Sequence, residues 1–159
     1  MLANFRKIDI SRLKDFKFTV EEKMTNPDDM LTEIWEMQRT LNNYTLKNNG
    51  FTHTFDEIAS DKKLQQEWVK NYTLAMRQEC AELYDSTNWK WWRTKVDLFD
   101  VQNVKVELID ILHFWMSACM VMGLEPEDVL RMYKQKNEVN YNRQKNGYIK
   151  KDENDSRHI

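Results

Sequence analysis

Apolar residues recur every three or four positions along most of the chain, which is the period of an amphipathic helix. The first such stretch follows Asn26 and Pro27, a pair typical of helix starts, and ends at residues 48–50, Asn-Asn-Gly. Gln38 lies in the apolar register of this stretch. The other members of the register are Leu31, Ile34, Trp35, Leu41 and Leu46. Residues 51–60 then predict a connection.

Three further helices are predicted. Asp61 is a candidate N-cap for a helix that reaches about Asp85. A third helix covers residues 101–122 and is closed by Gly123, and a fourth begins at Pro126 and ends near Gly147. The apolar register of the fourth helix includes one amide, Asn137. The other members of this register are Val129, Leu130, Tyr133 and Tyr141.

Composition supports an all-helical fold. The 159 residues include only 3 glycines and 2 prolines, too few for the many tight turns of a β-rich protein. The length suits one domain, so we expect an all-α bundle of four to five helices. Residues 1–25 are read as an N-terminal arm or short helix, 26–148 as the helical domain, and 149–159 as a charged tail.

Charge and cysteine usage exclude several classes of protein. The 24 basic and 26 acidic residues nearly balance, which argues against a nucleic-acid partner. The N-terminus lacks an apolar signal segment, and the uncharged stretch at residues 111–123 is shorter than a membrane span and predicts a buried helix. Cys80 and Cys119 form no metal-binding pattern and are read as small core residues. We therefore expect a cytoplasmic protein without a membrane partner.

Two pairs of acidic residues interrupt apolar helix faces. Glu79 and Glu82 are three positions apart on the second helix, and Glu107 and Asp110 are three apart on the third. Glu79 occupies a position of the stripe that otherwise consists of Leu64, Trp68, Tyr72, Met76 and Leu83. Antiparallel packing of the two helices would join all four carboxylates, and such a set suits Mg²⁺ or Mn²⁺.

Two other interpretations of these acids stay open. They could be solvent-exposed glutamates that pair with Arg77 or Lys105, because acidic residues at this spacing are common on helix surfaces. A di-iron site is the second alternative, but it needs two Glu-x-x-His units, and only Asp110 with His113 approaches one.

Two segments next to the acids offer groups for a base and for phosphate. Lys90 stands among Trp89, Trp91 and Trp92, which would give a stacking surface beside a cation. The fourth helix ends with cations interspersed with amides, and arginine suits bidentate phosphate contact. These cations are Lys136, Arg143 and Lys145. The alternatives are tryptophans that anchor a core or a dimer interface, and a solvated basic helix end.

Taken together, these segments resemble the dimeric dUTPases of the all-α NTP pyrophosphatase (MazG-like) superfamily. The resemblance covers residues 30–148, in the family's order. Its segments are QRTLN (38–42), ECAELYDSTNWKWW (79–92), ELIDILHFWMS (107–117) and KNEVNYNRQKNGY (136–148). Better-known members are longer and carry an extra helical insertion, which this chain lacks.

The resemblance implies a role for each matched position. Glu79, Glu82, Glu107 and Asp110 would hold Mg²⁺, with Mn²⁺ as a substitute. Gln38 and Asn42 fall where the family reads uracil and deoxyribose, and Trp91 lies near the nucleoside. Phosphate-contacting positions fall on Lys90, Asn137, Arg143 and Tyr148, and we add Lys136 from its place in the same basic segment.

The implied reaction is Mg²⁺-dependent hydrolysis of dUTP, and also of dUDP, to dUMP by a homodimer. We assign Glu79 as general base, with Glu82 equivalent from its spacing, and Lys90 and Arg143 to the leaving pyrophosphate. Two alternatives are a related pyrophosphatase acting on dCTP or a non-standard nucleotide, and a helical interaction module without catalysis.

Overall fold

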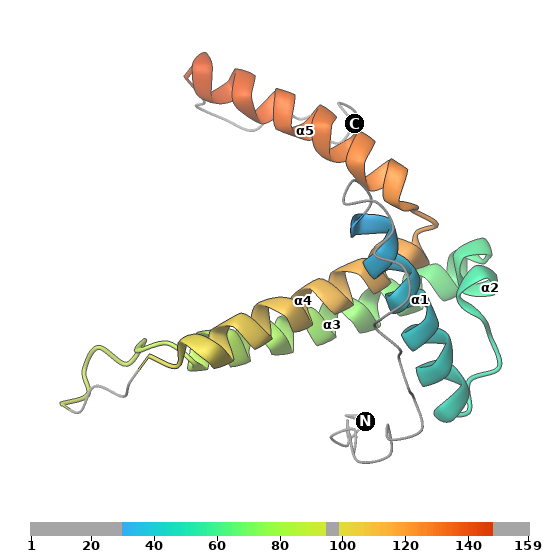
Figure 1. Cartoon of the computed structure of the whole chain (residues 1–159), viewed down its shortest axis with the longest axis horizontal. Coiled ribbons are helices and arrows are strands. Elements are labelled where there is room, and N and C mark those ends of the chain that lie inside the picture. The colour runs from blue at the N-terminus through green and yellow to red at the C-terminus, as the bar shows by residue number, and fades with distance from the viewer. Residues whose placement is uncertain (1–29, 95–98, 148–159) are drawn as a thin grey trace. The chain divides into compact units, whose positions relative to one another are not determined.

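The computed structural model describes residues 30–94 and 99–147, and within them it contains five helices and no strand (Figure 1). The helices are α1 (Met30–Asn48), α2 (Phe55–Ser60), α3 (Lys62–Asp85), α4 (Val101–Val121) and α5 (Pro126–Lys145). The all-α class is confirmed. The predicted helix start at Asn26, the N-terminal arm and the charged tail lie outside the described residues.

Local signals account for most helix ends. The carboxylate of Asp61 accepts hydrogen bonds from the backbone N–H groups of Lys63 and Leu64, at 2.8 and 2.9 Å, and starts α3 as predicted. These two bonds also hold the pKa of Asp61 below its ordinary value. Asp100 caps α4 in the same way, and Gly123 ends it in the left-handed conformation with φ of 72°.

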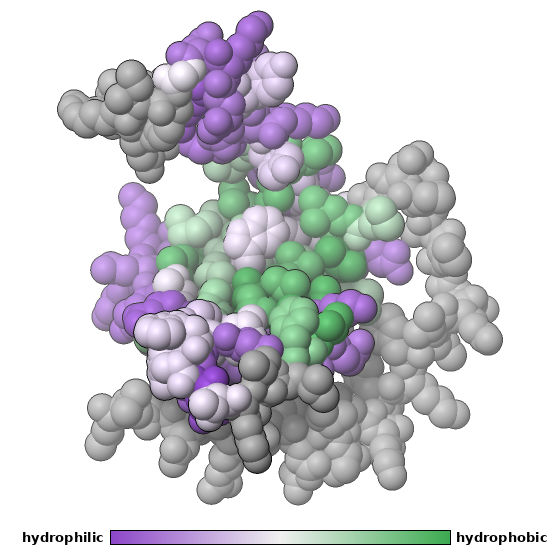
Figure 2. Space-filling view, turned by 90° about the vertical axis from the view of Figure 1, so that its left-hand side faces the viewer, coloured by the Kyte–Doolittle hydropathy of each residue, from purple (hydrophilic) through white to green (hydrophobic). Residues whose placement is uncertain are grey.

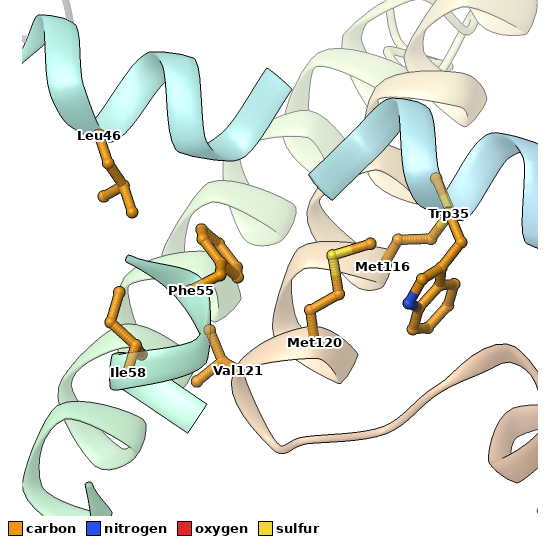
Figure 3. Close-up of a cluster of buried hydrophobic side chains, with 7 residues drawn as sticks. All are labelled: Trp35, Leu46, Phe55, Ile58, Met116, Met120 and Val121. Atoms are coloured by element: carbon orange, nitrogen blue, oxygen red, sulfur yellow. The ribbon is translucent and has the colours of Figure 1, made fainter. Parts of the chain in front are cut away.

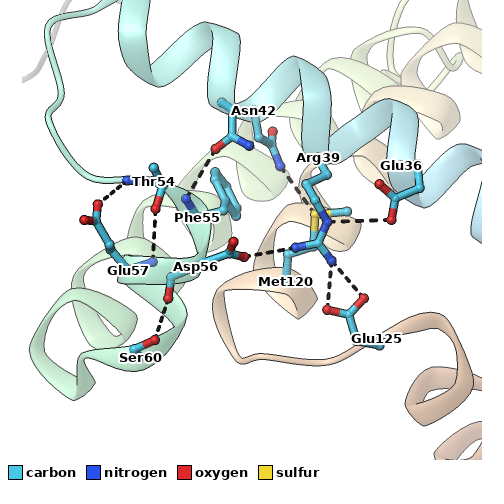
Figure 4. Close-up of polar contacts among 11 residues, drawn as sticks. Glu36, Arg39, Asn42, Thr54, Phe55, Asp56, Glu57, Ser60, Met120 and Glu125 are labelled. Atoms are coloured by element: carbon cyan, nitrogen blue, oxygen red, sulfur yellow. Dashed lines mark hydrogen bonds and ion pairs between the residues drawn. The ribbon is translucent and has the colours of Figure 1, made fainter.

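The prediction of a plain connection over residues 51–60 was wrong, because this segment contains α2. Thr54 and Glu57 form a capping box, in which the Thr54 hydroxyl accepts from the Glu57 N–H and the Glu57 carboxylate accepts from the Thr54 N–H at 2.7 Å (Figure 4). The short helix is completed by burial of Phe55 and Ile58. The sequence signal was the Thr-x-x-Glu spacing.

Helices α3 and α4 lie side by side and run antiparallel (Figure 1). Asn103 near the start of α4 contacts Ser86 at the end of α3, whereas Phe114 further along α4 packs against Tyr72, earlier in α3. The residue numbers therefore rise along one helix as they fall along the other. This arrangement confirms the packing expected for the two acidic pairs.

The hydrophobic core lies where α1, α2 and the second half of α4 meet (Figure 3). Trp35 of α1, Ile58 of α2 and Val121 of α4 are each 0% exposed. The rest of the buried cluster comprises Leu46, Phe55, Met116 and Met120, and Leu64, Trp68, Tyr72 and Leu112 pack against it. The acidic positions lie outside this cluster, with Glu79 in the second half of α3 and Glu107 and Asp110 in the first half of α4.

Arg39 links three helical segments through its guanidinium group. It donates to both carboxylate oxygens of Glu125 at 2.8 Å, to Asp56 at 3.3 Å, and lies 3.8 Å from Glu36 (Figure 4). Glu125 precedes α5 and Asp56 belongs to α2, so one side chain on α1 fixes the approach of both.

Several positions differ from the sequence-based expectation. Cys80 was predicted to be a core residue but is exposed, because it lies outside the narrow stripe of α3 that faces its neighbours. Cys119 is half-buried against the core, and burial raises the pKa of its thiol to about 11. Exposed members of the predicted apolar registers are Ile34, Leu41, Leu130, Tyr133 and Tyr141.

The described helices were also compared with the length and hydropathy of a membrane span. None of them meets both requirements by itself, whereas α4 and α5 do so as a pair that bends by 103° between them.

Candidate active site

Three carboxyl groups converge between α3 and α4. Glu79, Glu107 and Asp110 each offer an oxygen, and these oxygens lie within 4.8 Å of one another. Glu107 is buried at 7% exposure, while Glu79 and Asp110 are half-buried. Like charges at this separation repel, so a cation or a bound proton among the oxygens would stabilise the cluster.

Burial and the neighbouring charges change the acidity of Glu79. Burial raises the pKa of Glu79, and the negative charges of Glu82 and Asp110 and the contact with Glu107 raise it further, to about 7. In the described part of the chain, neither Arg77 nor Lys105 forms an ion pair with these acids. The alternative of surface ion pairs with those two residues is therefore not supported.

A neutral donor holds Glu107, the buried member of the cluster. Asn103, one turn before Glu107 on α4, donates from Nδ2 to the Glu107 carboxylate at 3.1 Å and to the Ser86 hydroxyl at 2.6 Å. The second bond crosses to the end of α3. Asn103 therefore fixes the side chain of Glu107 and the spacing of the two helices together.

Glu82, the fourth predicted ligand, does not join the group of three. It is exposed, and its carboxylate accepts a hydrogen bond from Gln78 Nε2 on its own helix at 3.0 Å. Its charge nevertheless contributes to the raised pKa of Glu79. Glu82 therefore stands beside the cluster, and its role as a ligand stays a prediction.

The donor set fits a hard divalent cation. Mg²⁺ and Mn²⁺ prefer carboxylate oxygen, and the three converging groups provide it without thiolate or imidazole among them. A bound cation would also offset the repulsion from the neighbouring carboxylates, which contributes to the raised pKa of Glu79. Within residues 30–94 and 99–147, no histidine joins the group of three acids, and His113 contacts Gln38, so the described site does not support the di-iron alternative.

A buried polar network lies further along α4. Gln38 on α1 donates from Nε2 to Asn42 Oδ1 at 2.9 Å and to Ser117 Oγ at 3.1 Å, and Gln38 Oε1 contacts His113 Nδ1. Ser117 is 0% exposed, and Gln38 and Asn42 are 5% and 6% exposed. The sequence reasoning named the two amides, considered His113 only as a di-iron ligand, and assigned no role to Ser117.

One polar stripe on α4 contains residues of both the carboxylate cluster and the buried polar network. Its members are Asn103, Glu107, Asp110, His113 and Ser117, which follow one another at intervals of three and four. The acids lie near the middle of this stripe and the buried network at its end. The spacing is visible in the sequence, but the sequence analysis did not connect these five residues, because neutral polar residues are common on helices.

The aromatic-basic segment follows α3. Lys90 Nζ lies 4.8 Å from the ring centre of Trp89, whose indole N–H donates to Asp85 at 3.0 Å. Trp89 also packs on Tyr84 and on the edge of Trp92. Trp91 is 86% exposed. The rings thus form a local aromatic cluster, and the expected stacking surface for a base stays a prediction.

The predicted phosphate-contacting residues of the last helix are not brought to the carboxylates. Asn137 is exposed on α5, Lys136 and Arg143 are half-buried on the same helix, and Tyr148 lies outside the described residues. Their proposed contacts with substrate stay predictions.

Comparison with known proteins was made for the whole chain. A family model described as dUTPase matches residues 30–123. The chain is 26% identical to the dCTP pyrophosphatase of Enterobacteria phage LZ5 over 150 residues, 80% of this chain and 87% of that relative. It is 32% identical to the dCTP pyrophosphatase of Enterobacteria phage T4 over 74 residues, 40% of this chain and 43% of that relative. No solved structure matches.

The family match covers the elements that build the site. It begins with α1, includes all of α2, α3 and α4, and ends at the glycine that closes α4. The carboxylate cluster and the buried polar network lie entirely within it. The chain therefore belongs to the all-α dUTPase family.

Proposed function

We propose that this protein hydrolyses dUTP, and also dUDP, to dUMP in a reaction that depends on Mg²⁺. The observation that carries the proposal is the convergence of Glu79, Glu107 and Asp110 within 4.8 Å, with no lysine or arginine paired to them in the described chain. Membership of the dUTPase family supports the same reaction class.

The proposed metal site consists of this group together with Glu82. Mg²⁺, or Mn²⁺ in its place, would neutralise charge on the phosphates and lower the pKa of a coordinated water. Glu82 would need to turn from its bond with Gln78 toward the cluster. Asn103 holds Glu107 in place throughout, because its amide is already bonded to that carboxylate.

We assign the general base to Glu79, with Glu82 as the alternative. The assignment rests on the place of Glu79 in the cluster, where its carboxylate oxygen lies within 4.8 Å of those of Glu107 and Asp110 and so beside a water that the metal would hold. Lys90 would contact the phosphates beside the cluster. Lys136, Asn137, Arg143 and Tyr148 keep this role as part of the proposal, with Lys90 and Arg143 stabilising the leaving pyrophosphate.

The polar stripe of α4 supports an orientation of the bound substrate along the helix. Ten residues separate Glu107 from Ser117, which corresponds to about 15 Å along a helix. The phosphates would lie at the carboxylates and the nucleoside toward Gln38 and Asn42, with Trp91 beside it. Amides suit this end because they donate and accept hydrogen bonds without adding charge.

A second copy of the chain is proposed to complete the active form. Apolar side chains gather in the middle of the face shown in Figure 2. Exposed apolar residues include Met37 and Leu41 on α1 and Ile109 and Trp115 on α4. Light scattering at micromolar concentration is expected to give twice the mass of 19.3 kDa. A mass of one chain would contradict the homodimer.

Hydrolysis of dCTP is the second candidate, and it is favoured by the two phage relatives that bear the name dCTP pyrophosphatase. Pyrophosphate release from each deoxynucleoside triphosphate with Mg²⁺ tests both candidates. Faster release from dCTP than from dUTP would replace the first candidate by the second.

The matched variants are Glu79→Gln and Glu107→Gln, which remove charge from the cluster and change little in volume. Each is expected to lower turnover at least about a hundredfold while the protein stays folded. Glu67→Gln, on an exposed part of α3, is the control and should keep the wild-type rate. Full activity in both cluster variants would contradict a catalytic role of this cluster, and a wild type without turnover on any nucleotide would favour a helical module without catalysis.

A further inference from the structure

The side chain of Asn103 bonds to two acceptors that belong to different helices. Its Nδ2 atom donates to Glu107 Oε1 at 3.1 Å, within α4, and to Ser86 Oγ at 2.6 Å, at the end of α3. An amide nitrogen carries two hydrogens, so it can serve both acceptors at once. The Ser86 hydroxyl gives its own hydrogen to the backbone carbonyl of Glu82 at 2.9 Å, which leaves its oxygen to accept from Asn103.

The backbone of Asn103 is fixed as well. Its N–H donates to the carboxylate of Asp100, the N-cap of α4, at 2.9 Å. Glu107 is 7% exposed, so water can replace a lost partner of its carboxylate only in part. The place of Glu107 Oε1 therefore depends on an amide that is held at both its backbone and its side chain.

This bond limits how Glu107 can bind a cation. A carboxylate binds an ion through one oxygen or through both, and the second mode needs Oε1 and Oε2 to face the same ion. In Glu107, a hydrogen of the Asn103 amide already points at Oε1. That hydrogen carries partial positive charge and repels a cation that approaches the same oxygen. Binding through Oε2 alone is therefore favoured.

The two modes suit different ions. Mg²⁺ is small and requires near-octahedral coordination, which single carboxylate oxygens and waters supply. Ca²⁺ accepts more oxygen ligands at longer distances, and it can take both oxygens of one carboxylate. If Glu107 offers only one oxygen, Ca²⁺ loses a ligand that Mg²⁺ does not need.

We propose that Asn103 is a positioning residue for metal selection, which holds Glu107 as a one-oxygen ligand and so favours Mg²⁺ over Ca²⁺. The inference rests on the proposed function, in which Glu79, Glu107 and Asp110 hold the metal. Asn103 acts through Glu107, because an amide nitrogen that donates hydrogen bonds does not bind a cation.

Metal binding in the absence of nucleotide provides the first test. Titration calorimetry of the protein with MgCl₂ and with CaCl₂ gives the ratio of the two dissociation constants. Asn103→Leu keeps a similar side-chain volume but donates no hydrogen bond. It is expected to shift the ratio toward Ca²⁺ at least about fivefold. A loss of stability alone would leave the ratio unchanged, since both ions bind the same folded protein.

Ser86→Ala is the matched control. It removes the acceptor on α3 and leaves the bond from Asn103 to Glu107 in place. The variant should therefore be less stable than the wild type but keep the wild-type ratio of the two dissociation constants. An unchanged ratio in folded Asn103→Leu, or equal shifts in both variants, overturns the role of Asn103.

The second test needs no variant. A crystal structure of the wild type grown with MgCl₂ shows how many oxygens of Glu107 bind the ion. We expect one Glu107 oxygen on Mg²⁺, with the bond from Asn103 to the other oxygen retained. Two Glu107 oxygens on Mg²⁺, or a broken bond between Asn103 and Glu107, overturns the inference even if Asn103→Leu fails to fold.

The outcomes separate this inference from the proposed function. If the wild type hydrolyses dUTP or dCTP with Mg²⁺ and either test fails, only the role of Asn103 is overturned. A wild type that binds neither Mg²⁺ nor Ca²⁺ overturns the proposed metal site and, with it, metal selection by Asn103.

Discussion

The carboxyl groups of Glu79 on α3 and Glu107 on α4 lie close together across the two helices, with oxygens within 4.8 Å of each other. Burial raises the pKa of Glu79, and the negative charges of Glu82 and Asp110 raise it further, to about 7. Glu79 therefore holds a proton near neutral pH that an exposed glutamate would have lost.

Mg²⁺ binding at the proposed site is expected to displace this proton. Affinity should therefore rise with pH, by up to about tenfold per unit below pH 7, and level off above it. Titration calorimetry at pH 6, 7 and 8, in buffers of different ionisation enthalpy, measures both the affinity and the proton released. An affinity independent of pH would contradict the assignment.

Without divalent cations, the same proton makes stability depend on pH. The pKa of Glu79 is higher in the folded state than its ordinary 4.5, so its contribution favours folding below about pH 4.5 and is lost as the pH rises through 7. Glu79→Gln should therefore melt at a higher temperature than the wild type at pH 8. This difference should disappear near pH 4.5, as thermal denaturation in EDTA would show.

Asn103→Ala is expected to lower the free energy of unfolding by about 1–3 kcal/mol, because the buried Glu107 carboxylate loses a donor. Urea denaturation measures this loss. Ser86→Ala removes only the partner on α3, and a double-mutant cycle between these positions reports the bond across the helices. Strict additivity of the two losses would show that this bond contributes nothing.

Arg39→Ala is expected to cost about 1–3 kcal/mol, since one half-buried guanidinium bonds acids of α1, α2 and the segment before α5. Arg131→Ala is the control, because its ion pair with Asp128 lies within α5 and both of these side chains are more exposed than that of Arg39. That change should cost no more than about 0.5 kcal/mol. Chemical denaturation of both variants gives the comparison, and equal losses would contradict the linking role.

Much of the fold could be predicted from sequence because its helices have strong local signals. Asp61, Gly123 and Pro126 mark where helices begin or end. The places of Glu79 and Glu107 in otherwise apolar helix segments predicted that these acids face inward. Local signals were insufficient where burial depends on distant neighbours. Cys80 follows Glu79 by one position, about 100° around the helix, and that rotation was enough to expose it.

The candidate site was predictable in its residue types but not in its geometry. Glu79 and Glu82 differ by about 60° around the helix, so spacing alone could not decide which one faces α4. The contacts of His113 and Ser117 with Gln38 could not be predicted, because only the packing of α1 against α4 brings these side chains together.

The position of the hydrophobic core also has a consequence for motion. The fully buried apolar side chains of the described chain lie near α1 and α2, whereas the carboxylates lie on the part of the α3–α4 pair outside that cluster. Local opening between α3 and α4 there needs less free energy than separation near Trp35 or Val121. Backbone amides around Glu82 and Asn103 should accordingly exchange with deuterium sooner than those around Met116, and the oxygens of the cluster can adjust their spacing while the core remains intact.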